Sequence, residues 1–151
     1  MDKPSTDPRS RHLLGPDDPE PFDVVNRDGT AHLQLVCDHA SRRVPVALGN
    51  LGISADAFDR HIAYDIGAEG IARLLSAALD APLVLAGYSR LVLDLNRPVG
   101  HPESIPAVSD GVALPANQGL DAAARRQRVR ELFEPYHDAV NRAIARVWQR
   151  G

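Results

Sequence analysis

The sequence contains a single cysteine, Cys37, and this excludes an intrachain disulfide. Neither charge sign dominates, because 17 basic residues stand against 20 acidic ones. This balance gives no electrostatic basis for binding nucleic acid or an anionic membrane. The chain also lacks an apolar run near the ~20 residues of a membrane span, and its first residues lack the apolar core of a signal peptide. We therefore expect a cytoplasmic protein, with neither nucleic acid nor membrane as a partner.

The length of 151 residues fits about one domain. Residues 1–30 are rich in Pro, Asp, Arg and Ser and show no sustained periodicity, so they predict a mobile N-terminal arm. Within this arm, Val24 and Val25 indicate a short strand that leads into an Asp-Gly turn. The remaining residues, 31–151, predict one α/β domain.

Two apolar segments predict buried strands, at Leu33–Cys37 and Pro82–Ala86. Between them lie a helical turn from Ala55 to Arg60, which Ser54 can cap, and a clearer helix over Gly67–Leu79. The clearer helix carries an apolar stripe typical of a helix that faces a core. A strand, a helix and a strand at this spacing predict a right-handed parallel βαβ unit. The stripe consists of Ile71, Leu74, Leu75, Ala78 and Leu79.

Residues 88–98 alternate apolar and polar side chains, which predicts a further strand. Its two faces would carry Leu91, Leu93 and Leu95 on one side and Val92, Asp94 and Asn96 on the other. Two arginines, Arg90 and Arg97, lie within this segment. An arginine fork suits carboxylates and phosphates, so the pair could bind an anionic substrate. Alternatively, both could form an ion-pair network with Asp94 that has no role beyond structure.

The C-terminal part predicts a long irregular segment followed by a long helix. Residues 98–120 carry four prolines and three glycines, and an irregular segment of this length is more often functional than idle. Asp121 is a suitable N-cap for a helix that extends nearly to the C-terminus, with Pro135 expected to kink or split it. Its seven arginines are diluted by acidic residues, so they indicate a solvated face rather than a nucleic-acid-binding helix.

Several residues that can bind metal or move protons follow the first buried strand. His39 comes directly after it, and His61 and Asp65 would share one face if their segment were helical, with Asp59 just before them. Imidazole and carboxylate groups are suitable zinc ligands, and an open position on zinc activates water. A thiol mechanism through Cys37 is less favoured, because a cysteine inside an apolar strand is usually inert. A serine hydrolase is disfavoured too, since the sequence contains no G-x-S-x-G motif.

Three longer motifs and three shorter ones occur in a fixed order along the chain. The longer motifs are Cys37-Asp38-His39-Ala40-Ser41-x-Arg43-Val44-Pro45, Asp59-x-His61-x-x-Tyr64-Asp65-Ile66-Gly67-Ala68 and Tyr88-Ser89-Arg90-Leu91-Val92-Leu93-Asp94-Leu95-Asn96-Arg97-Pro98. The shorter ones are Ser104-Ile105-Pro106, Asn117-Gln118-Gly119-Leu120 and Pro135-Tyr136-His137. In order and spacing these motifs resemble the N-formylglutamate amidohydrolase family over about residues 31 to 148.

The resemblance implies a three-layer α/β fold of the phosphorylase/hydrolase-like type, with a βαβ-containing sheet and flanking helices, related to the zinc carboxypeptidases. It implies hydrolysis of the amide of an N-formyl or N-acyl amino acid by metal-bound water. His39 and His61 would then bind zinc or another divalent metal, and Asp65 and Asp59 would be catalytic residues or metal partners. The substrate carboxylates would be held by Ser89, Arg90, Asn96 and Arg97.

Members of the family continue beyond the long helix into a further strand with a Ser-x-His-Ser type motif. The resemblance therefore implies that this chain corresponds to the N-terminal part of the family fold. Two functions remain open. One is a metal-dependent amidohydrolase acting on a small N-acyl amino acid. The other is a catalytically inactive binding module that forms a homo-oligomer across an open sheet edge, since exposed edges and apolar faces recruit partners.

Overall fold

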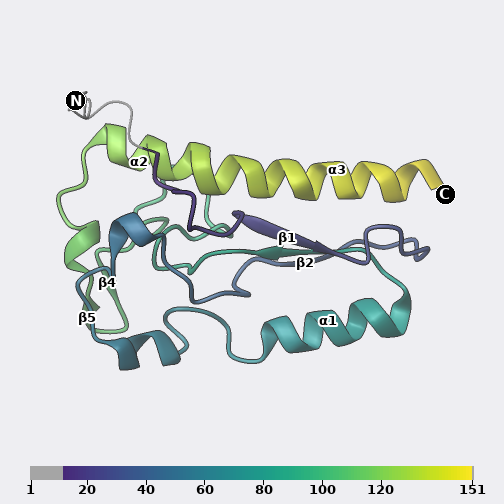
Figure 1. The fold of residues 1–151 in the computed structure, drawn as a ribbon, viewed down its shortest axis with the longest axis horizontal. Helices are drawn as coiled ribbons and strands as arrows, with labels where there is room; N and C mark the ends of the chain where they lie inside the picture. Colours follow the sequence, from purple (N-terminus) through teal and green to yellow (C-terminus); the bar gives the residue numbers. More distant parts are fainter. Residues whose placement is uncertain (1–11, 151) are drawn as a thin grey trace, which may run out of the picture.

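The computed structural model describes residues 12–150 and shows a mixed α/β domain (Figure 1). The main sheet consists of β1 (Phe22–Val25), β2 (Leu35–Cys37) and β3 (Leu83–Ala86). A small hairpin consists of β4 (Val108–Ser109) and β5 (Val112–Ala113). The helices are α1 (Ala68–Leu79), α2 (Ala122–Arg128) and α3 (Glu134–Arg150), and a π-helical turn, Val129–Phe133, joins the last two. Short 3-10 helices cover Val46–Leu48, Ala55–Asp59 and Pro115–Asn117.

The main sheet has the strand order β1, β3, β2, so β3 is its central strand. β2 runs parallel to β3, and β1 runs antiparallel to it. Because α1 connects the two parallel strands, the predicted βαβ unit is confirmed. All residues of β3 are buried, as expected for a strand with neighbours on both sides and helices on both faces.

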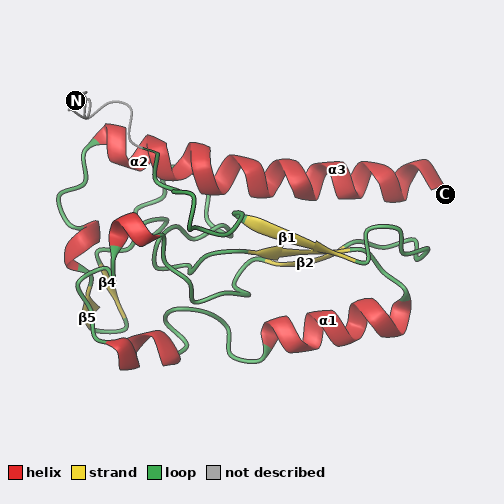
Figure 2. Cartoon of the chain, in the orientation of Figure 1, coloured by secondary structure: helices red, strands yellow, loops and turns green. Residues whose placement is uncertain are grey.

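Helices cover both faces of this sheet. Figure 1 shows α1 on one side and the long α3 on the other, with β1 and β2 between them. Figure 2 shows the same arrangement with the loops gathered at the end of the sheet away from the C-terminus of α3. α1 contacts β2 and β3, whereas α3 contacts β1 and β3. The structure therefore shows the predicted layers of a mixed α/β domain, while a relation to the zinc carboxypeptidases stays a prediction.

The segment predicted as an N-terminal arm, residues 1–30, is described from residue 12 onward. β1 confirms the short strand predicted near Val24, and it pairs with β3 along its whole length. The backbone N–H groups of Leu13 and Leu14 donate to the Glu131 carboxylate, at 2.8 and 3.0 Å. The described part of the segment is thus tied to the sheet and to the C-terminal helices. The residues before it lie outside the described range.

α1 confirms the predicted helix, but its apolar stripe does not face the sheet. The stripe residues Ile71, Leu74, Leu75 and Leu79 are all exposed, with Leu74 the most exposed at 72%. The helix packs on the sheet through small side chains instead. Ala72 lies against the buried residues of β3, and the buried Ser76 hydroxyl donates to the carbonyl of Ala81. Close packing through small residues turns the larger side chains away from the sheet.

Residues 88–98, which we call the site loop, are not a strand as predicted but a series of turns. The N–H of Val92 donates to the carbonyl of Ser89 at 2.9 Å, and the N–H of Arg97 donates to the carbonyl of Asp94 at 3.2 Å. All residues from Leu91 to Leu95 are buried. The alternating pattern therefore did not mark one buried and one exposed face, because polar and apolar side chains are both enclosed here.

Side chains from the C-terminal part hold the site loop in place of a neighbouring strand. Arg128 is only 2% exposed, and its Nη1 donates to the carbonyl of Val92 at 2.8 Å and to the side-chain oxygen of Asn117 at 2.7 Å. The Asn117 amide donates in turn to the carbonyl of Leu91 at 2.8 Å. Burial lowers the pKa of Arg128 to about 10. The backbone of the site loop is thus satisfied by two buried polar side chains.

The long C-terminal helix begins as predicted and is interrupted near Pro135. The Asp121 carboxylate accepts from the N–H of Ala124 at 2.7 Å, which confirms the predicted N-cap. The π-helical turn lies between α2 and α3 and ends two residues before Pro135. Proline has no N–H to donate to the preceding turn, so a local change of helix type at this point is the expected response.

The segment 98–120 was predicted to be irregular, and it contains the β4–β5 hairpin. Asp110 and Gly111 form its turn, with φ angles of 45° and 76°. Two positive φ angles match the twist of a hairpin and explain the Asp-Gly pair.

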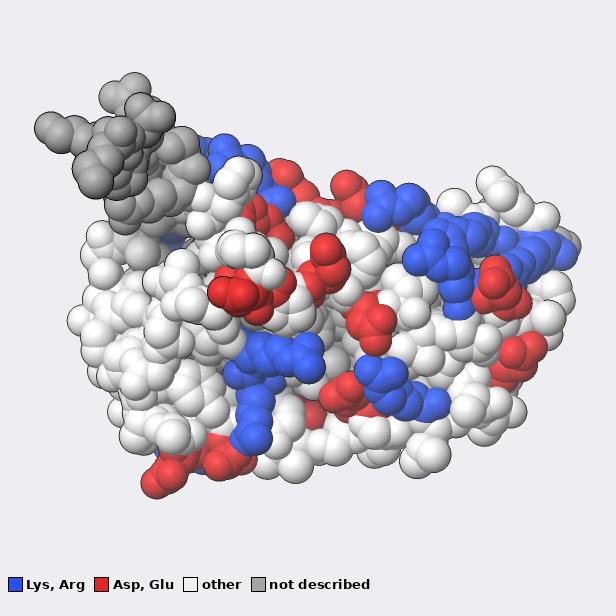
Figure 3. Space-filling view, in the orientation of Figure 1, with Lys and Arg blue, Asp and Glu red and all other residues white. Residues whose placement is uncertain are grey.

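The surface carries both signs of charge in close proximity. On the face shown in Figure 3, basic and acidic side chains lie side by side rather than as a field of one sign. None of the helices within residues 12–150 is long and apolar enough to cross a membrane.

Candidate active site

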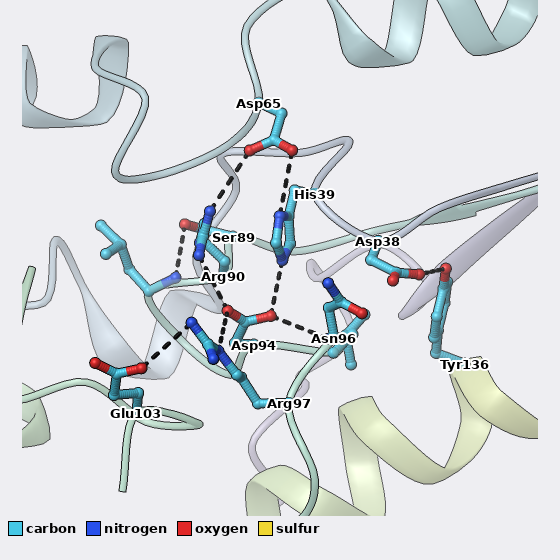
Figure 4. Close-up of polar contacts among 12 residues, drawn as sticks. Asp38, His39, Asp65, Ser89, Arg90, Asp94, Asn96, Arg97, Glu103 and Tyr136 are labelled. Carbon is cyan, nitrogen blue, oxygen red and sulfur yellow. Dashed lines mark hydrogen bonds and ion pairs between the residues drawn. The ribbon is translucent and has the colours of Figure 1, made fainter. Parts of the chain in front are cut away.

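The centre of the candidate site is a contact between His39 and Asp94. His39 follows β2 and Asp94 lies in the site loop, and both are buried, at 8% and 3% exposure. The Nε2 atom of His39 lies 2.7 Å from Oδ1 of Asp94, and its Nδ1 atom lies 3.4 Å from Oδ2 of Asp65 (Figure 4). The N–H of Asp65 also donates to the carbonyl of His39 at 3.0 Å. The imidazole therefore lies between two carboxylates, one buried and one half-exposed.

Asp94 collects further donors around its carboxylate. The backbone N–H of Asn96 donates to Oδ1 at 3.0 Å. Oδ2 lies 3.2 Å from Nη2 of Arg90 and 3.8 Å from Nε of Arg97. The ion-pair network that the sequence suggested as an alternative to anion binding does form. Its carboxylate is buried rather than solvated, however, and it also binds His39.

Charge pairing sets the protonation of the central contact. The hydrogen bond to Asp94 raises the pKa of His39 above its ordinary value, although burial opposes this. Burial alone would raise the pKa of Asp94, but hydrogen bonds from His39 and from the N–H of Asn96 hold it below its ordinary value. Both shifts favour an imidazolium next to a carboxylate.

The two arginines of the site loop use only some of their hydrogen-bond donors in contacts with protein carboxylates. Arg90 lies between Asp94 and Asp65, with Nη1 at 3.5 Å from Oδ1 of Asp65. Arg97 contacts Glu103 on its other side, with Nη2 at 3.2 Å from Oε2. The side chains of Arg90 and Arg97 are 30% and 42% exposed. Each guanidinium therefore keeps donors that a ligand can reach.

A polar cleft of about 180 Å³ lies beside these arginines. One wall comes from the site loop, and the other comes from the β4–β5 hairpin and the segment before it. The cleft is large enough for a small carboxylate but smaller than a pocket for a drug-sized ligand. We call it the polar cleft, and it is lined by Arg90, Leu91, Asp94, Arg97, Glu103, Pro106, Val108, Ser109 and Asp110.

Two of the predicted substrate residues, Ser89 and Asn96, lie differently from the arginines. Ser89 is fully buried, its hydroxyl donates to the carbonyl of Ala63 at 2.6 Å, and it accepts from the N–H of Leu91 at 3.2 Å. These bonds make Ser89 part of the turn rather than of the cleft wall. Asn96 is exposed, and its backbone N–H rather than its side chain contacts Asp94.

The structure does not bring the predicted residues Asp59 and His61 to the central contact. Asp59 forms an ion pair with Arg42. His61 is exposed, and its Nε2 atom lies 3.6 Å from Oδ2 of Asp110 in the hairpin turn. The reason is local structure, because residues 61–65 form turns rather than a helix. Without helical geometry, residues four apart no longer share a face.

The site also includes residues that sequence reasoning did not single out as functional. Asp94 was treated only as an ion-pair partner of the arginines, although it is the most connected group of the site. The phenol of Tyr136, fully buried in α3, donates to the carboxylate of Asp38, and burial raises its pKa. This bond ties α3 to the residue before His39 (Figure 4). The signal for Asp38 and Tyr136 was their place within the quoted motifs.

The residues present do not form a complete zinc site by themselves. Across residues 12–150, no group of three or more His, Cys, Asp or Glu side chains is placed to hold a metal ion. Both ring nitrogens of His39 already lie against carboxylates. A catalytic zinc site uses three protein ligands. The donor set of the described residues therefore does not fit the zinc site expected from the sequence.

Comparison with known proteins gives a family and a solved structure. A family model described as N-formylglutamate amidohydrolase matches residues 32–151. The crystal structure of gene product Atu2144 from Agrobacterium tumefaciens is similar, with 40% sequence identity and a TM-score of 0.86. The match covers 89% of this chain and 53% of that one, so this chain spans about half the length of its structural relative. The search of curated proteins finds no match.

Proposed function

Because the chain belongs to the N-formylglutamate amidohydrolase family, we propose that it acts in the hydrolysis of the amide of an N-formyl or N-acyl amino acid. The observation that supports this proposal most directly is the pair of partly exposed arginines, Arg90 and Arg97, beside the buried His39–Asp94 contact. An N-acyl amino acid carries a carboxylate for the arginines and an amide that needs proton transfer for its cleavage.

The arginines would hold the substrate carboxylate in the polar cleft. Arg97 contacts the exposed Glu103 carboxylate at 3.2 Å, and a substrate carboxylate can take the place of that side chain. A guanidinium binds a carboxylate through two parallel hydrogen bonds, which fixes orientation as well as position. Fixed orientation lowers the barrier for attack on the amide carbon. The exposed Asn96 amide lies next to Arg97 in sequence and could add a further hydrogen bond.

The proton transfers would be carried by the carboxylate and imidazole groups beside the cleft. Asp65 is half-exposed and lies between His39 and Arg90, so its carboxylate can reach water while its neighbours fix its position. We assign it the role of general base that takes a proton from the attacking water. His39, held by Asp94, orients this carboxylate. Asp59 stays a predicted catalytic residue, and the structure gives it a contact with Arg42 instead.

Zinc or another divalent metal stays an expectation of the sequence, and no step is assigned to it here. The His39 and His61 pair expected to bind it is not assembled, since His61 contacts the hairpin. The chain spans about half the length of its structural relative, and the proposed amide hydrolysis relies here on the carboxylate-binding and proton-transfer residues of the described part.

The test combines binding and turnover on the purified chain. N-formylglutamate binding is measured by calorimetry, and formate release is measured separately. Arg97→Ala should weaken binding by about 2 kcal/mol or more, because it removes a charged hydrogen-bond donor. Arg73→Ala is the matched control, since Arg73 pairs with Glu69 and Asp23 outside the polar cleft. Equal affinity of wild type and Arg97→Ala would contradict the carboxylate-binding role.

A second role, as a self-associating module, is favoured by the exposed stripe of α1. β2 is an edge strand of the main sheet, and α1 lies over it. Two copies related by a twofold axis could pair their β2 edges antiparallel and place both α1 stripes on the same face. We propose a second copy of this chain as the occupant. Light scattering should then show a dimer, and Leu74→Glu should give a monomer; a monomeric wild type would contradict this role.

A further inference from the structure

A second cavity lies behind the site loop and is distinct in character from the polar cleft. It measures about 550 Å³, within the range of small-molecule pockets. Its walls come from residues 99–105 and from α2 with the π-helical turn that follows it. We call it the apolar cavity, and its lining residues are Leu93, Arg97, Val99, Gly100, His101, Pro102, Ser104, Ile105, Arg125, Arg126, Val129 and Phe133.

The floor of the apolar cavity is aliphatic and aromatic. Leu93 and Ile105 are buried, at 3% and 4% exposure, so packing in the core fixes the positions of their side chains in the cavity wall. Val129 and Phe133 belong to the π-helical turn. The Phe133 ring lies 4.0 Å from the ring of His137, measured between centroids, which holds its orientation. An apolar group of a ligand would therefore meet a preformed surface and gain from leaving water.

The charges that line the apolar cavity are all positive. Arg97, Arg125 and Arg126 line it, and no aspartate or glutamate is among its lining residues. In the described structure, Arg125 is bonded through Nε to the carbonyl of Leu120 at 3.4 Å, a neutral partner. A cavity with an apolar floor and guanidinium groups of one sign is complementary to a molecule with an apolar body and an anionic head.

We propose that the apolar cavity binds an organic carboxylate with an aliphatic or aromatic body. Its carboxylate is held by the lining arginines and its body lies against Leu93, Ile105 and Phe133. Arg97 lines both this cavity and the polar cleft, so a ligand here changes the charge that Arg97 presents to the cleft. The proposal concerns binding alone and does not depend on amide hydrolysis.

The test uses 3-phenylpropionate as the probe, titrated into the full chain by calorimetry. The uncharged 3-phenylpropionamide and the small anion acetate are the comparison ligands. If both parts of the cavity contribute, the amide should bind at least about tenfold more weakly than the acid, since it forgoes the charge-assisted hydrogen bonds. Acetate should not bind measurably to the apolar cavity. Equal affinity for acid and amide, or no binding of the acid, overturns the proposal.

Variants locate the binding within the cavity. Val99 is 55% exposed and lines the cavity, so Val99→Trp fills it without entering the core. It should weaken 3-phenylpropionate binding by about tenfold or more. Val46→Trp is the matched control, because Val46 is 68% exposed and lies in another part of the chain. Unchanged affinity in both Val99→Trp and the double variant Arg125→Ala/Arg126→Ala overturns the proposal.

Competition separates two sources of such a ligand. If N-formylglutamate displaces 3-phenylpropionate, the two ligands compete for Arg97, which lines both the polar cleft and the apolar cavity. The apolar cavity then holds the apolar part of a substrate. Simultaneous binding of both means that the cavity holds a separate ligand. If the chain binds 3-phenylpropionate but does not hydrolyse N-formylglutamate, the proposed function is contradicted and the ligand site in the apolar cavity is not.

Discussion

The Nε2 atom of His39 lies 2.7 Å from the Oδ1 atom of Asp94, with both side chains enclosed by the fold. A buried or half-buried charge that loses its partner is costly, because no opposite charge then offsets its loss of hydration. Asp94→Ala leaves the imidazole and Arg90 without this partner and should lower the free energy of unfolding by about 3 kcal/mol. Urea denaturation measures the change. Asp138→Ala on the exposed face of α3 is the control and should change stability by less than about 0.5 kcal/mol.

Arg128 should behave as a structural residue of the site loop. Arg128→Met removes the donors to Val92 and Asn117 and should destabilise the chain by about 3 kcal/mol, since it leaves buried acceptors unsatisfied. Arg130→Met, an exposed arginine two residues on, is the matched control. Equal denaturation midpoints for the two variants would show that the buried bonds contribute nothing.

A leucine-to-alanine substitution should be costly in the sheet beneath α1 and nearly neutral on the exposed side of α1. Leu83 in β3 is fully buried, so Leu83→Ala should lower the free energy of unfolding by about 2 to 5 kcal/mol. Leu74 is exposed, so Leu74→Ala should change it by less than about 0.5 kcal/mol in the monomer. Denaturation at low protein concentration measures both. A large loss for Leu74→Ala under those conditions would mean that its side chain is covered in solution.

Glu131 should give the chain an acid-dependent contribution to stability. Burial acts to raise its pKa, but hydrogen bonds from the N–H groups of Leu14 and Leu13 and from Gln127 hold it below the ordinary value. A carboxyl group with a depressed folded-state pKa stabilises above its unfolded pKa, about 4.3 for glutamate, and loses this contribution as pH falls through the folded value. Denaturation midpoints should therefore fall more steeply from pH 6 to pH 3 in wild type than in Glu131→Ala.

Sequence periodicity and local capping rules predicted the elements that form regular strands and helices. The βαβ unit, the Asp121 cap and the interruption near Pro135 follow from local rules of strand and helix formation, and the structure shows all three. The site loop could not be predicted in the same way. Its alternation resembled a strand, but its partners are Arg128 and Asn117, which lie far along the chain. Tertiary partners of this kind leave no local pattern.

The candidate site was predicted only in part, because some of its contacts depend on tertiary structure. The motifs identified His39, Asp65, Arg90 and Arg97, and the structure brings these four together. Asp94 was overlooked as a functional residue because a carboxylate between two arginines reads as an ordinary ion pair. His61 and Asp65 were linked on the assumption of a helix that the structure replaces with turns.

The bond from Tyr136 also bears on the order in which parts of the site can form during folding. Tyr136 lies 98 residues from Asp38, whereas Leu35 and Leu83, which are paired in the βαβ unit, lie 48 residues apart. Contacts of high sequence separation are slow to form, because the entropy of closing the chain is lost before the contact is gained. The βαβ unit can therefore be complete before Tyr136 bonds to Asp38. Fixing the backbone beside His39 is then a late event that awaits docking of α3.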